Sequence, residues 1–466
     1  MSAALRVAVI GGGISGLTAA FRLHQAGHDV RVFESSDRLG GQIKSEMRGG
    51  MLLEWGPDSL VAHKPAGERL CRELGLADEL LRLPSGGSSM QVVHDGQLQQ
   101  LPDGFLMIAP TKFGPLMTNP MLSPLGRARA ALERFIPSRR ASGDETIQQF
   151  VTRRWGRELY ERVAEPVLGG LFSADATRLS ANACIPRMAA MERQHGSVIA
   201  GIRQAQAERE KQSRPSVGVY ALERGMSSLT EALAAALPPD AVRKNAPVES
   251  IQDAGDHWTI HASVGSYDVD AVILACPAFV AAKLLSEHDQ EIADELSSIE
   301  YASCATVNLL YDATALAKPL RGFGFFVARS EGSPLLACNY TSHKFEKRAP
   351  SGCVMLRAFV GGAGREPIDA IDEGELVRIA HEGLARLLDL RGAPRFGRAR
   401  RFPSAMPQMV IGSRERRERL ARPRAGLALC GSSIGAVGLP DCIESAEQAI
   451  EQLMKQGGKD QLEQVG

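Results

Sequence analysis

The stretch Arg6-Val7-Ala8-Val9-Ile10-Gly11-Gly12-Gly13-Ile14-Ser15-Gly16 decides the fold of this chain. Its apolar, β-branched start predicts a buried strand, and the glycines that follow fit the pattern G-x-G-x-x-G at the start of a helix. Gly11 permits the tight turn, Gly13 lets a diphosphate approach the backbone, and Gly16 lets helix and strand pack closely. The turn therefore predicts a dinucleotide site at a helix N-terminus.

Glu34 supports this prediction, because it follows a second predicted strand, Asp29–Phe33. A carboxylate at that point accepts hydrogen bonds from ribose hydroxyls. Glycine makes up 47 of the 466 residues, so the glycine pattern alone would also fit a ligand-free turn. The strand, helix, second strand and terminal acid together favour the dinucleotide site.

The overall composition excludes several other classes of protein. Lys and Arg (54) balance Asp and Glu (54), so no net field attracts nucleic acid. The apolar runs Ala271–Ala282 and Leu427–Leu439 are shorter than the roughly 18–20 residues that span a bilayer. The eight cysteines lack the close spacing of metal ligands, so no metal site is expected, and the sequence indicates a cytoplasmic protein.

Arg38-Leu39-Gly40-Gly41 follows Glu34, and the resulting E-x-x-x-R-x-G-G string resembles the second signature of the flavin amine oxidase superfamily. The resemblance implies FAD rather than NAD. Three further stretches resemble superfamily segments: Glu54-Trp55-Gly56-Pro57-Asp58-Ser59 along the flavin ring, Asn245–Ile251 at the adenine, and Gly431–Ser445 at the pyrimidine end of the flavin.

This resemblance assigns a set of residues to FAD. They are Gly11, Gly12, Gly13, Ile14, Ser15, Gly16, Glu34, Ser35, Arg38, Gly40, Gly41, Gln42, Gly56, Pro57, Asp58, Ser59, Val248, Ser432, Val437, Gly438 and Leu439. Cys442 lies in Pro-Asp-Cys-Ile rather than in the Ser-Gly-Gly-Cys setting of the covalent flavin cysteine of monoamine oxidases. We therefore expect non-covalent FAD.

The middle of the chain narrows the resemblance. Pro166–Asp175, with Leu179-Ser180, is similar to the "G-I-Y-A-G-D…L-S" string of the oxygen-dependent porphyrinogen oxidases, and Gly438–Ile443 continues the match. The likeness runs from Val7 to about Leu453 and is greatest to the coproporphyrinogen III oxidases of Gram-positive bacteria, relatives of the protoporphyrinogen oxidases.

The resemblance implies an enzyme of heme biosynthesis. It would use FAD and oxygen for the six-electron oxidation of coproporphyrinogen III to coproporphyrin III, of protoporphyrinogen IX to protoporphyrin IX, or of both. Met90 stands where many protoporphyrinogen oxidases carry a propionate-binding arginine, which favours coproporphyrinogen. A flavin amine oxidase or a carotenoid desaturase-like enzyme is the alternative.

Substrate contacts follow from the same resemblance. Gly170 would place its backbone carbonyl, as the catalytic group, at the reacting meso carbon; alternatively, it only breaks a helix. The phenylalanines would form an apolar clamp for a tetrapyrrole, or they are ordinary core residues. The predicted substrate-binding residues are Val167, Phe323, Gly324, Phe326 and Phe359.

The expected fold is α/β, with a Rossmann-like FAD-binding domain of the GR2 type interleaved with a mixed-sheet substrate domain and an inserted helical lobe. We expect the FAD-binding domain in 1–86, 216–277 and 423–466, the substrate domain in 87–110 and 278–422, and the helical lobe in 111–215.

The start of the helical lobe combines prolines with apolar residues and with Arg127, Arg129 and Arg134. Such a segment is typical of a peripheral contact with the inner face of the cell membrane. A lid over the substrate pocket or an ordinary core segment fits the pattern equally well. Whether the chain forms a homodimer also stays open.

Overall fold

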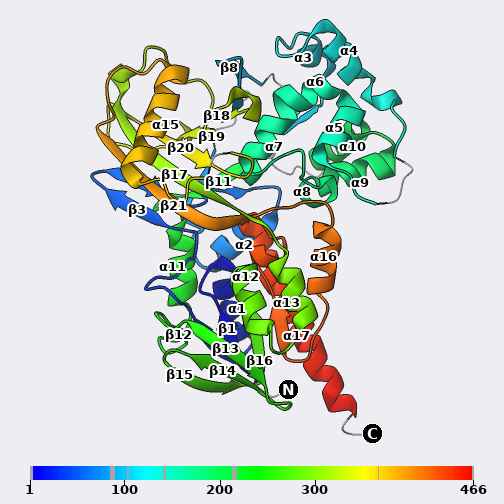
Figure 1. Cartoon of the computed structure of the whole chain (residues 1–466), viewed down its shortest axis with the longest axis vertical. Coiled ribbons are helices and arrows are strands. Elements are labelled where there is room, and N and C mark those ends of the chain that lie inside the picture. Colours follow the sequence, from blue (N-terminus) through cyan, green and yellow to red (C-terminus); the bar gives the residue numbers. More distant parts are fainter. Residues whose placement is uncertain are drawn as a thin grey trace.

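The computed structural model describes residues 4–83, 90–101, 104–139, 143–211, 218–365 and 367–463. Three parts are visible in Figure 1: a lower part that holds both ends of the chain, a sheet with one long helix at upper left, and a group of helices at upper right. The chain is therefore α/β, and the segments of the lower part are far apart in the sequence.

A five-stranded parallel sheet forms the centre of the lower part. Its strands, in spatial order, are β12 (Val242–Arg243), β2 (Asp29–Phe33), β1 (Arg6–Ile10), β16 (Ala271–Leu274) and β22 (Leu427–Leu429). Strand β1 lies in the middle of the order and is buried from Val7 to Ile10, as expected for a parallel strand covered on both faces. The turn that follows β1 is therefore at the centre of the sheet.

Helices and a small sheet cover the two faces of this parallel sheet. One core packs Val7 and Val9 against α1 (Ile14–Gln25), α2 (Pro65–Glu73), α11 (Ser227–Ala235) and α17 (Leu439–Glu463). The other core packs Ala8 and Ile10 against α12 (Ala278–Leu285), α13 (Gln290–Ser297) and the antiparallel sheet β13 (Val248–Asp253), β14 (Trp258–Ala262) and β15 (Gly265–Val269).

A seven-stranded mixed sheet forms the upper left part. Its order is β21 (Phe396–Pro407), β17 (Tyr301–Asp312), β20 (Cys353–Gly361), β19 (Leu335–Tyr340), β18 (Gly324–Val327), β7 (Met90–His94) and β8 (Gln97–Gln100). Helix α15 (Glu373–Leu388) covers one face with Leu376, Ala380 and Leu384. The hairpin β3 (Ser45–Arg48) and β4 (Met51–Glu54) packs on it through a separate small core.

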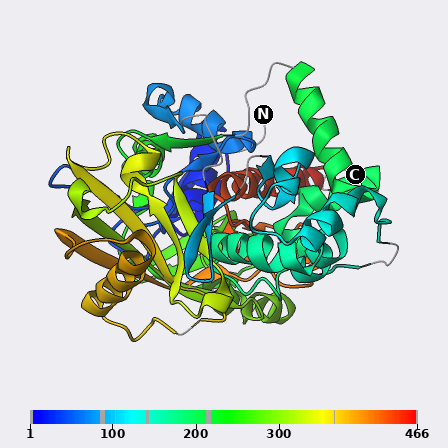
Figure 2. The same cartoon turned by 90° about the horizontal axis from the view of Figure 1, so that it is seen from above.

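The helical lobe lies beside this sheet, as the view from above shows (Figure 2). Its elements are α3 (Phe113–Met117), α4 (Pro124–Ala131), η2 (Leu132–Phe135), α5 (Ile147–Trp155), α6 (Arg157–Leu159), η3 (Tyr160–Ala164), α7 (Glu165–Phe172), α8 (Ala181–Cys184), α9 (Pro186–His195) and α10 (Val198–Lys211). Buried Glu133 accepts hydrogen bonds from Arg154 Nε (2.8 Å), Ser197 Oγ (2.6 Å) and Val198 N (2.9 Å), so one carboxylate joins η2, α5 and α10.

The packing does not follow the expected domain ranges throughout. Helices α12 and α13 precede the seven-stranded sheet but pack on the parallel sheet, so the chain enters the seven-stranded sheet at Tyr301 rather than at 278. Ile108 and Ala109, expected with that sheet, lie in the core of the helical lobe. The predicted boundaries at 86/87 and 215/216 lie outside the described residues. Within the described ranges, no helix combines the length and the apolar character needed to cross a membrane.

Candidate functional site

The turn after β1 has the geometry that its glycines predict. Gly11 has a φ of 111°, in the region that favours glycine. A methyl group at Gly16 would overlap the Gly11 carbonyl oxygen, so α1 and β1 approach as closely as backbone allows. At Gly13 the nearest atom to such a methyl group is Gly41 Cα, 4.0 Å away, so the space above Gly13 is open. The turn is a cradle for a group that needs bare backbone.

The second signature lies directly against this turn. Gly40 N donates to Gly12 O at 2.8 Å, and Gly12 N donates to Glu34 Oε2 at 2.8 Å. The other carboxylate oxygen, Oε1, accepts from Ser36 N (2.8 Å) and Ser36 Oγ (2.7 Å). A carboxylate has about four acceptor positions, so the oriented Glu34 side chain keeps capacity for ribose hydroxyls.

Arg38 stabilises the turn that carries it. Its guanidinium donates to Leu39 O and Ile43 O, both at 3.0 Å, and also to Gly41 O. Burial lowers the pKa of Arg38, only partly offset by Glu34 and Asp37. The described contacts thus hold Arg38 by carbonyls, which leaves its charge available to a diphosphate.

The Glu54–Ser59 segment meets the second signature at Gly56. A methyl group at Gly56 would overlap Gln42 O, while the Gln42 side chain donates to Ala405 O at 2.8 Å. The two segments that sequence similarity places along the cofactor are therefore in contact. Pro57 and Ser59 follow in the same half-buried stretch.

The Asp58 side chain, however, contacts protein cations. Lys344 Nζ lies 3.1 Å from both carboxylate oxygens, Arg357 Nη1 lies 3.4 Å from Oδ2, and Asn339 Nδ2 donates to Oδ2 at 3.3 Å. Burial alone would raise the pKa of Asp58, but Lys344 and Arg357 outweigh it and hold the pKa below its ordinary value. Asp58 therefore joins the flavin-facing segment to the seven-stranded sheet.

The C-terminal segment returns to the glycine turn. A methyl group at Gly431 would lie 3.0 Å from Ser15 Oγ, and Gly431 N donates to Ser445 Oγ at 2.9 Å. Ser432, Val437, Gly438 and Leu439 follow, and Gly438 N donates to Asp441 Oδ2 at 3.3 Å as α17 begins. The backbone amides of Gly438 and Leu439 lie at the start of a 25-residue helix, where its dipole favours negative charge.

Cys442 is built into the protein core and is a poor candidate for a covalent flavin link. Its thiol donates to Ala436 O at 3.3 Å, and its side chain is buried. Burial raises the pKa of the Cys442 thiol to about 12, so the reactive thiolate is scarce.

The segment expected at the adenine lies against the end of β2. Ala246 N donates to Glu34 O and Asn245 N donates to Ser36 O, each at 2.9 Å. These bonds place the start of β13, with Val248, beside the end of β2. Ser35 is exposed at this corner.

The predicted substrate residues come together from three elements. Helix α7 packs on β18 and β19, and a methyl group at Gly170 would overlap the Phe326 ring. Phe359 lies on β20, with the Arg357 guanidinium carbon 4.8 Å from its ring centroid. Gly324 pairs with Asn339, and a methyl group there would overlap Cys338 O.

Two predicted substrate residues are placed differently from the others. Val167 is buried in the core of the helical lobe, where it contributes packing rather than an open surface. Phe323 is half-buried with its ring centroid 6.4 Å from that of His343. The structure thus brings Gly170 and Phe326 into direct contact, whereas Val167 lies in the core of the helical lobe.

Gly170 does not break its helix. Helix α7 continues to Phe172 and ends at Ser173, whose φ is 48°. The Gly170 carbonyl oxygen accepts only a long hydrogen bond of 3.4 Å from Ser173 N, because Ala174 N bonds Gly169 O instead. A carbonyl with spare acceptor capacity therefore lies at the helix end.

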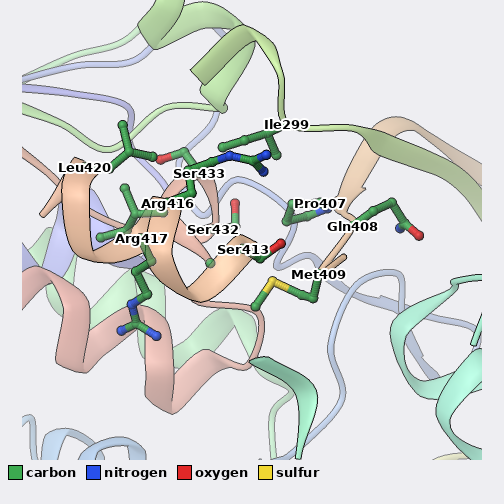
Figure 3. Close-up of a pocket in the computed structure, with 12 residues that line it drawn as sticks. Ile299, Pro407, Gln408, Met409, Ser413, Arg416, Arg417, Leu420, Ser432 and Ser433 are labelled. Carbon is green, nitrogen blue, oxygen red and sulfur yellow. The ribbon is translucent and has the colours of Figure 1, made fainter. Parts of the chain in front are cut away.

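A small cavity of about 20 Å³ borders the C-terminal flavin segment. Figure 3 shows Pro407, Gln408 and Met409 on one side of it and Ser413 and Arg416 of α16 (Ser413–Leu420) on the other. Ser432 and Ser433 complete its wall. The space suffices for a water molecule and not for a cofactor.

Three functional candidates were missed by sequence reasoning: Lys344, Arg357 and Asn339. Each lies in a strand or a short helix of the substrate part, without a local motif around it. What these residues share is their contact with Asp58, and this contact is visible in the three-dimensional structure but not in the sequence.

The residues present fit an FAD. Bare backbone at Gly13, an oriented Glu34, a guanidinium held by carbonyls at Arg38 and helix N-termini at α1 and α17 are the donors and spaces that a dinucleotide needs. Bound there, FAD would supply two-electron redox chemistry.

Comparison with known proteins agrees with this geometry. Residues 14–454 match the family described as flavin containing amine oxidoreductase. Coproporphyrinogen III oxidase of Bacillus subtilis (strain 168) is 30% identical, over 95% of this chain and 97% of the relative. The enzyme of the same name from Staphylococcus aureus is 31% identical over 96% and 98%, and Bos taurus protoporphyrinogen oxidase is 30% identical over 96% and 98%.

Solved structures show the same architecture. A crystal structure from Exiguobacterium sp. 255-15, assigned as a protoporphyrinogen oxidase, superposes with a TM-score of 0.85 at 27% identity, covering 98% of this chain and 100% of that one. Cyclohexylamine oxidase from Brevibacterium oxydans has a TM-score of 0.71 at 16% identity, covering 97% and 99%, which shows a common fold alone. The chain belongs to the FAD-dependent flavin amine oxidoreductase family, in the group that contains the coproporphyrinogen III and protoporphyrinogen oxidases.

Proposed function

We propose that this chain is an FAD-dependent, oxygen-using porphyrinogen oxidase of heme biosynthesis, with coproporphyrinogen III as its preferred substrate. The observation that carries the proposal is the match of 95–96% of the chain to coproporphyrinogen III oxidases. Met90 at the start of β7 supports the choice of substrate, because it pairs with Gly324 at the predicted pocket and offers no charge to a propionate.

The chemistry requires orientation more than side-chain acids or bases. Bound flavin would accept the electrons in three two-electron steps, with oxygen as the final acceptor. The chain's own contribution is an apolar pocket wall at Phe326 and Phe359 and a carbonyl at Gly170 that can hold a polarised hydrogen of the substrate.

Aerobic turnover tests the proposal. Protein loaded with FAD is mixed with coproporphyrinogen III, and porphyrin fluorescence should rise with time. Protoporphyrinogen IX in a parallel cuvette should give a lower kcat/KM. Traces that rise no faster than a blank without protein, for both porphyrinogens and from protein whose flavin absorbance is intact, would refute the oxidase.

Anaerobic mixing separates an oxidase from a flavin-binding scaffold. Coproporphyrinogen III should bleach the flavin absorbance without oxygen, and admission of oxygen should restore it. The similarity to amine oxidases lies at 16–18% identity and supports the fold alone, so an amine substrate should leave the spectrum unchanged.

We also propose that the tip of the helical lobe makes a peripheral contact with a membrane. Phe113, Leu125 and Phe135 have exposed fractions of 64%, 83% and 77%, and they belong to α3, α4 and η2. Figure 1 shows α3 and α4 together at the top of the lobe. Clustered exposed apolar side chains of this size mark contact sites.

Two of the predicted arginines are held in the lobe by backbone carbonyls. Arg127 donates to Leu122 O and Met117 O, and Arg129 donates to Arg153 O and Arg154 O, which fixes both side chains without neutralising their charge. Co-sedimentation with vesicles tests the contact: Leu125→Ser with Phe135→Ser should release the protein, whereas unchanged binding or no binding by the unaltered chain would refute it.

A further inference from the structure

Arg357 contacts both sides of the predicted active site. Its Nη2 donates to Gly56 O, its Nη1 lies 3.4 Å from Asp58 Oδ2, and its guanidinium carbon lies 4.8 Å from the Phe359 ring centroid. Gly56 and Asp58 belong to the flavin-facing segment, and Phe359 belongs to the substrate wall. One planar side chain thus contacts a backbone carbonyl, a carboxylate and an aromatic ring.

The surroundings fix Arg357 in this position. Its side chain is 3% exposed, and burial lowers its pKa while Asp58 and Glu54 oppose that shift. Asn308, which pairs with Arg357 across β17 and β20, donates from Nδ2 to Glu54 O at 3.3 Å. On the far side of the segment, Glu54 accepts from Met226 N (2.8 Å) and Ser45 Oγ (2.7 Å).

The cluster holds several buried charges, and Arg348 is a third cation close enough to interact with both Glu54 and Asp58. Asp58 has two cationic partners, Lys344 and Arg357, and Glu54 is a second buried carboxylate nearby. A buried charge without compensation is costly, so these groups must stay together. Lys344 contacts Asp58 and Ser59 but neither Gly56 O nor Phe359 in the described contacts. Lys344 and Arg357 both neutralise Asp58, and in the described contacts Arg357, unlike Lys344, also reaches Gly56 O and the Phe359 ring.

We propose that Arg357 is a positioning residue that fixes the flavin-facing Gly56–Asp58 backbone relative to Phe359, so that flavin and substrate wall keep one spacing. The role of Phe359 in this inference rests on the proposed function. The role of Gly56 and Asp58 beside the flavin depends only on membership of the family. A lysine cannot do the same, because it lacks the planar fork that bonds two acceptors and stacks on a ring.

Arg357→Lys tests the effect of Arg357 on the bound flavin, and the test needs no porphyrinogen. It keeps the charge beside Asp58 and removes the fork. The dissociation constant of FAD should rise about tenfold, equivalent to about 1.4 kcal/mol, and the visible circular dichroism and reduction potential of bound flavin should change. Lys344→Met is the comparison variant: it removes a cation from the same carboxylate but no contact with Gly56 O or Phe359, so the FAD dissociation constant should rise less than in Arg357→Lys.

A second variant keeps the inference testable if Arg357→Lys folds poorly. Phe359→Leu leaves every charge in place and should shift the same flavin circular dichroism band. Where Arg357→Lys does fold, the double variant should show less than the sum of the two single effects, because the residues act through one contact. Additive effects, unchanged flavin signals in Arg357→Lys, or an equal rise of the FAD dissociation constant in Lys344→Met would overturn the proposal. A failure of porphyrinogen turnover would not affect these flavin measurements.

Discussion

Gly16 shows how much one missing methyl group can determine. A methyl group there would overlap the Gly11 carbonyl oxygen. The backbone on both sides of this contact is held in place by the central strand and the helix. Neither the strand nor the helix can move away without displacing the glycine turn. The overlap would therefore lower the stability of the fold and distort the predicted phosphate site.

Gly16→Ala should lower the free energy of unfolding by about 2–3 kcal/mol, the upper part of the range for overpacking, and should abolish FAD retention. Urea unfolding and the flavin to protein absorbance ratio measure the two effects. Gly114→Ala is the control, because nothing lies within 4 Å of a methyl group at Gly114. Full flavin content in Gly16→Ala would contradict the assignment of the turn.

Asp58 lends itself to a test by pH. Its folded pKa lies below the ordinary value, because Lys344 and Arg357 outweigh burial. The stabilisation by the carboxylate is therefore full above the unfolded pKa of about 3.9 and is lost as the pH falls below it.

Asp58→Asn should cost about 3–5 kcal/mol at pH 7, since two buried cations lose their partner. The difference in unfolding free energy between the unaltered chain and the variant should shrink when the pH falls from 5 to 3. Denaturant titrations at several pH values give this difference. A constant difference would mean that the carboxylate is not a stabilising ion-pair partner in the folded state.

At the scale of elements, the strands and helices near the cofactor follow from local sequence, whereas their neighbours do not. The glycine turn, β2 with Glu34 and the last strand and helix occur as predicted, because each has a signature within a few residues. Helices α12 and α13 give no local sign of which sheet they cover. Arg357 acquires its role from pairing with Asn308 and from contact with Gly56, which are long-range events.

The element η2 depends on a buried ion pair with α5. Glu133 and Arg154 are both fully buried, and Glu133 also accepts from Ser197 and Val198. Glu133→Gln should destabilise the helical lobe by about 3 kcal/mol, the lower end of the range for a broken buried pair, because Arg154 would keep only the Glu192 carboxylate, 3.4 Å from its Nη1. Limited proteolysis and thermal unfolding would detect it. Glu161→Gln removes the exposed i,i+4 pair with Arg157 and should change stability by less than about 0.5 kcal/mol; equal effects of both variants would refute the difference.

For the whole molecule, the predicted substrate contacts depend on two parts of the chain that meet. Gly170 belongs to the helical lobe and Phe326 to the seven-stranded sheet, and a methyl group at Gly170 would overlap the Phe326 ring. The sequence could predict each residue by resemblance, but the contact itself requires the packing of α7 on β18. A substitution that changes the spacing between α7 and β18 should therefore change the shape of the predicted substrate site, even where each part keeps its own fold.

Gly170→Ala tests this dependence, because its methyl group would overlap the Phe326 ring and force it toward the substrate. FAD content should be unchanged, while the rate of flavin reduction by coproporphyrinogen III under anaerobic conditions should fall about tenfold or more. Phe326→Leu in the same chain should restore most of that rate, because the smaller side chain makes room for the methyl group. If the double variant stays as slow as Gly170→Ala, the loss arises from the helix end or its carbonyl, and the contact between the two parts does not set the shape of the pocket.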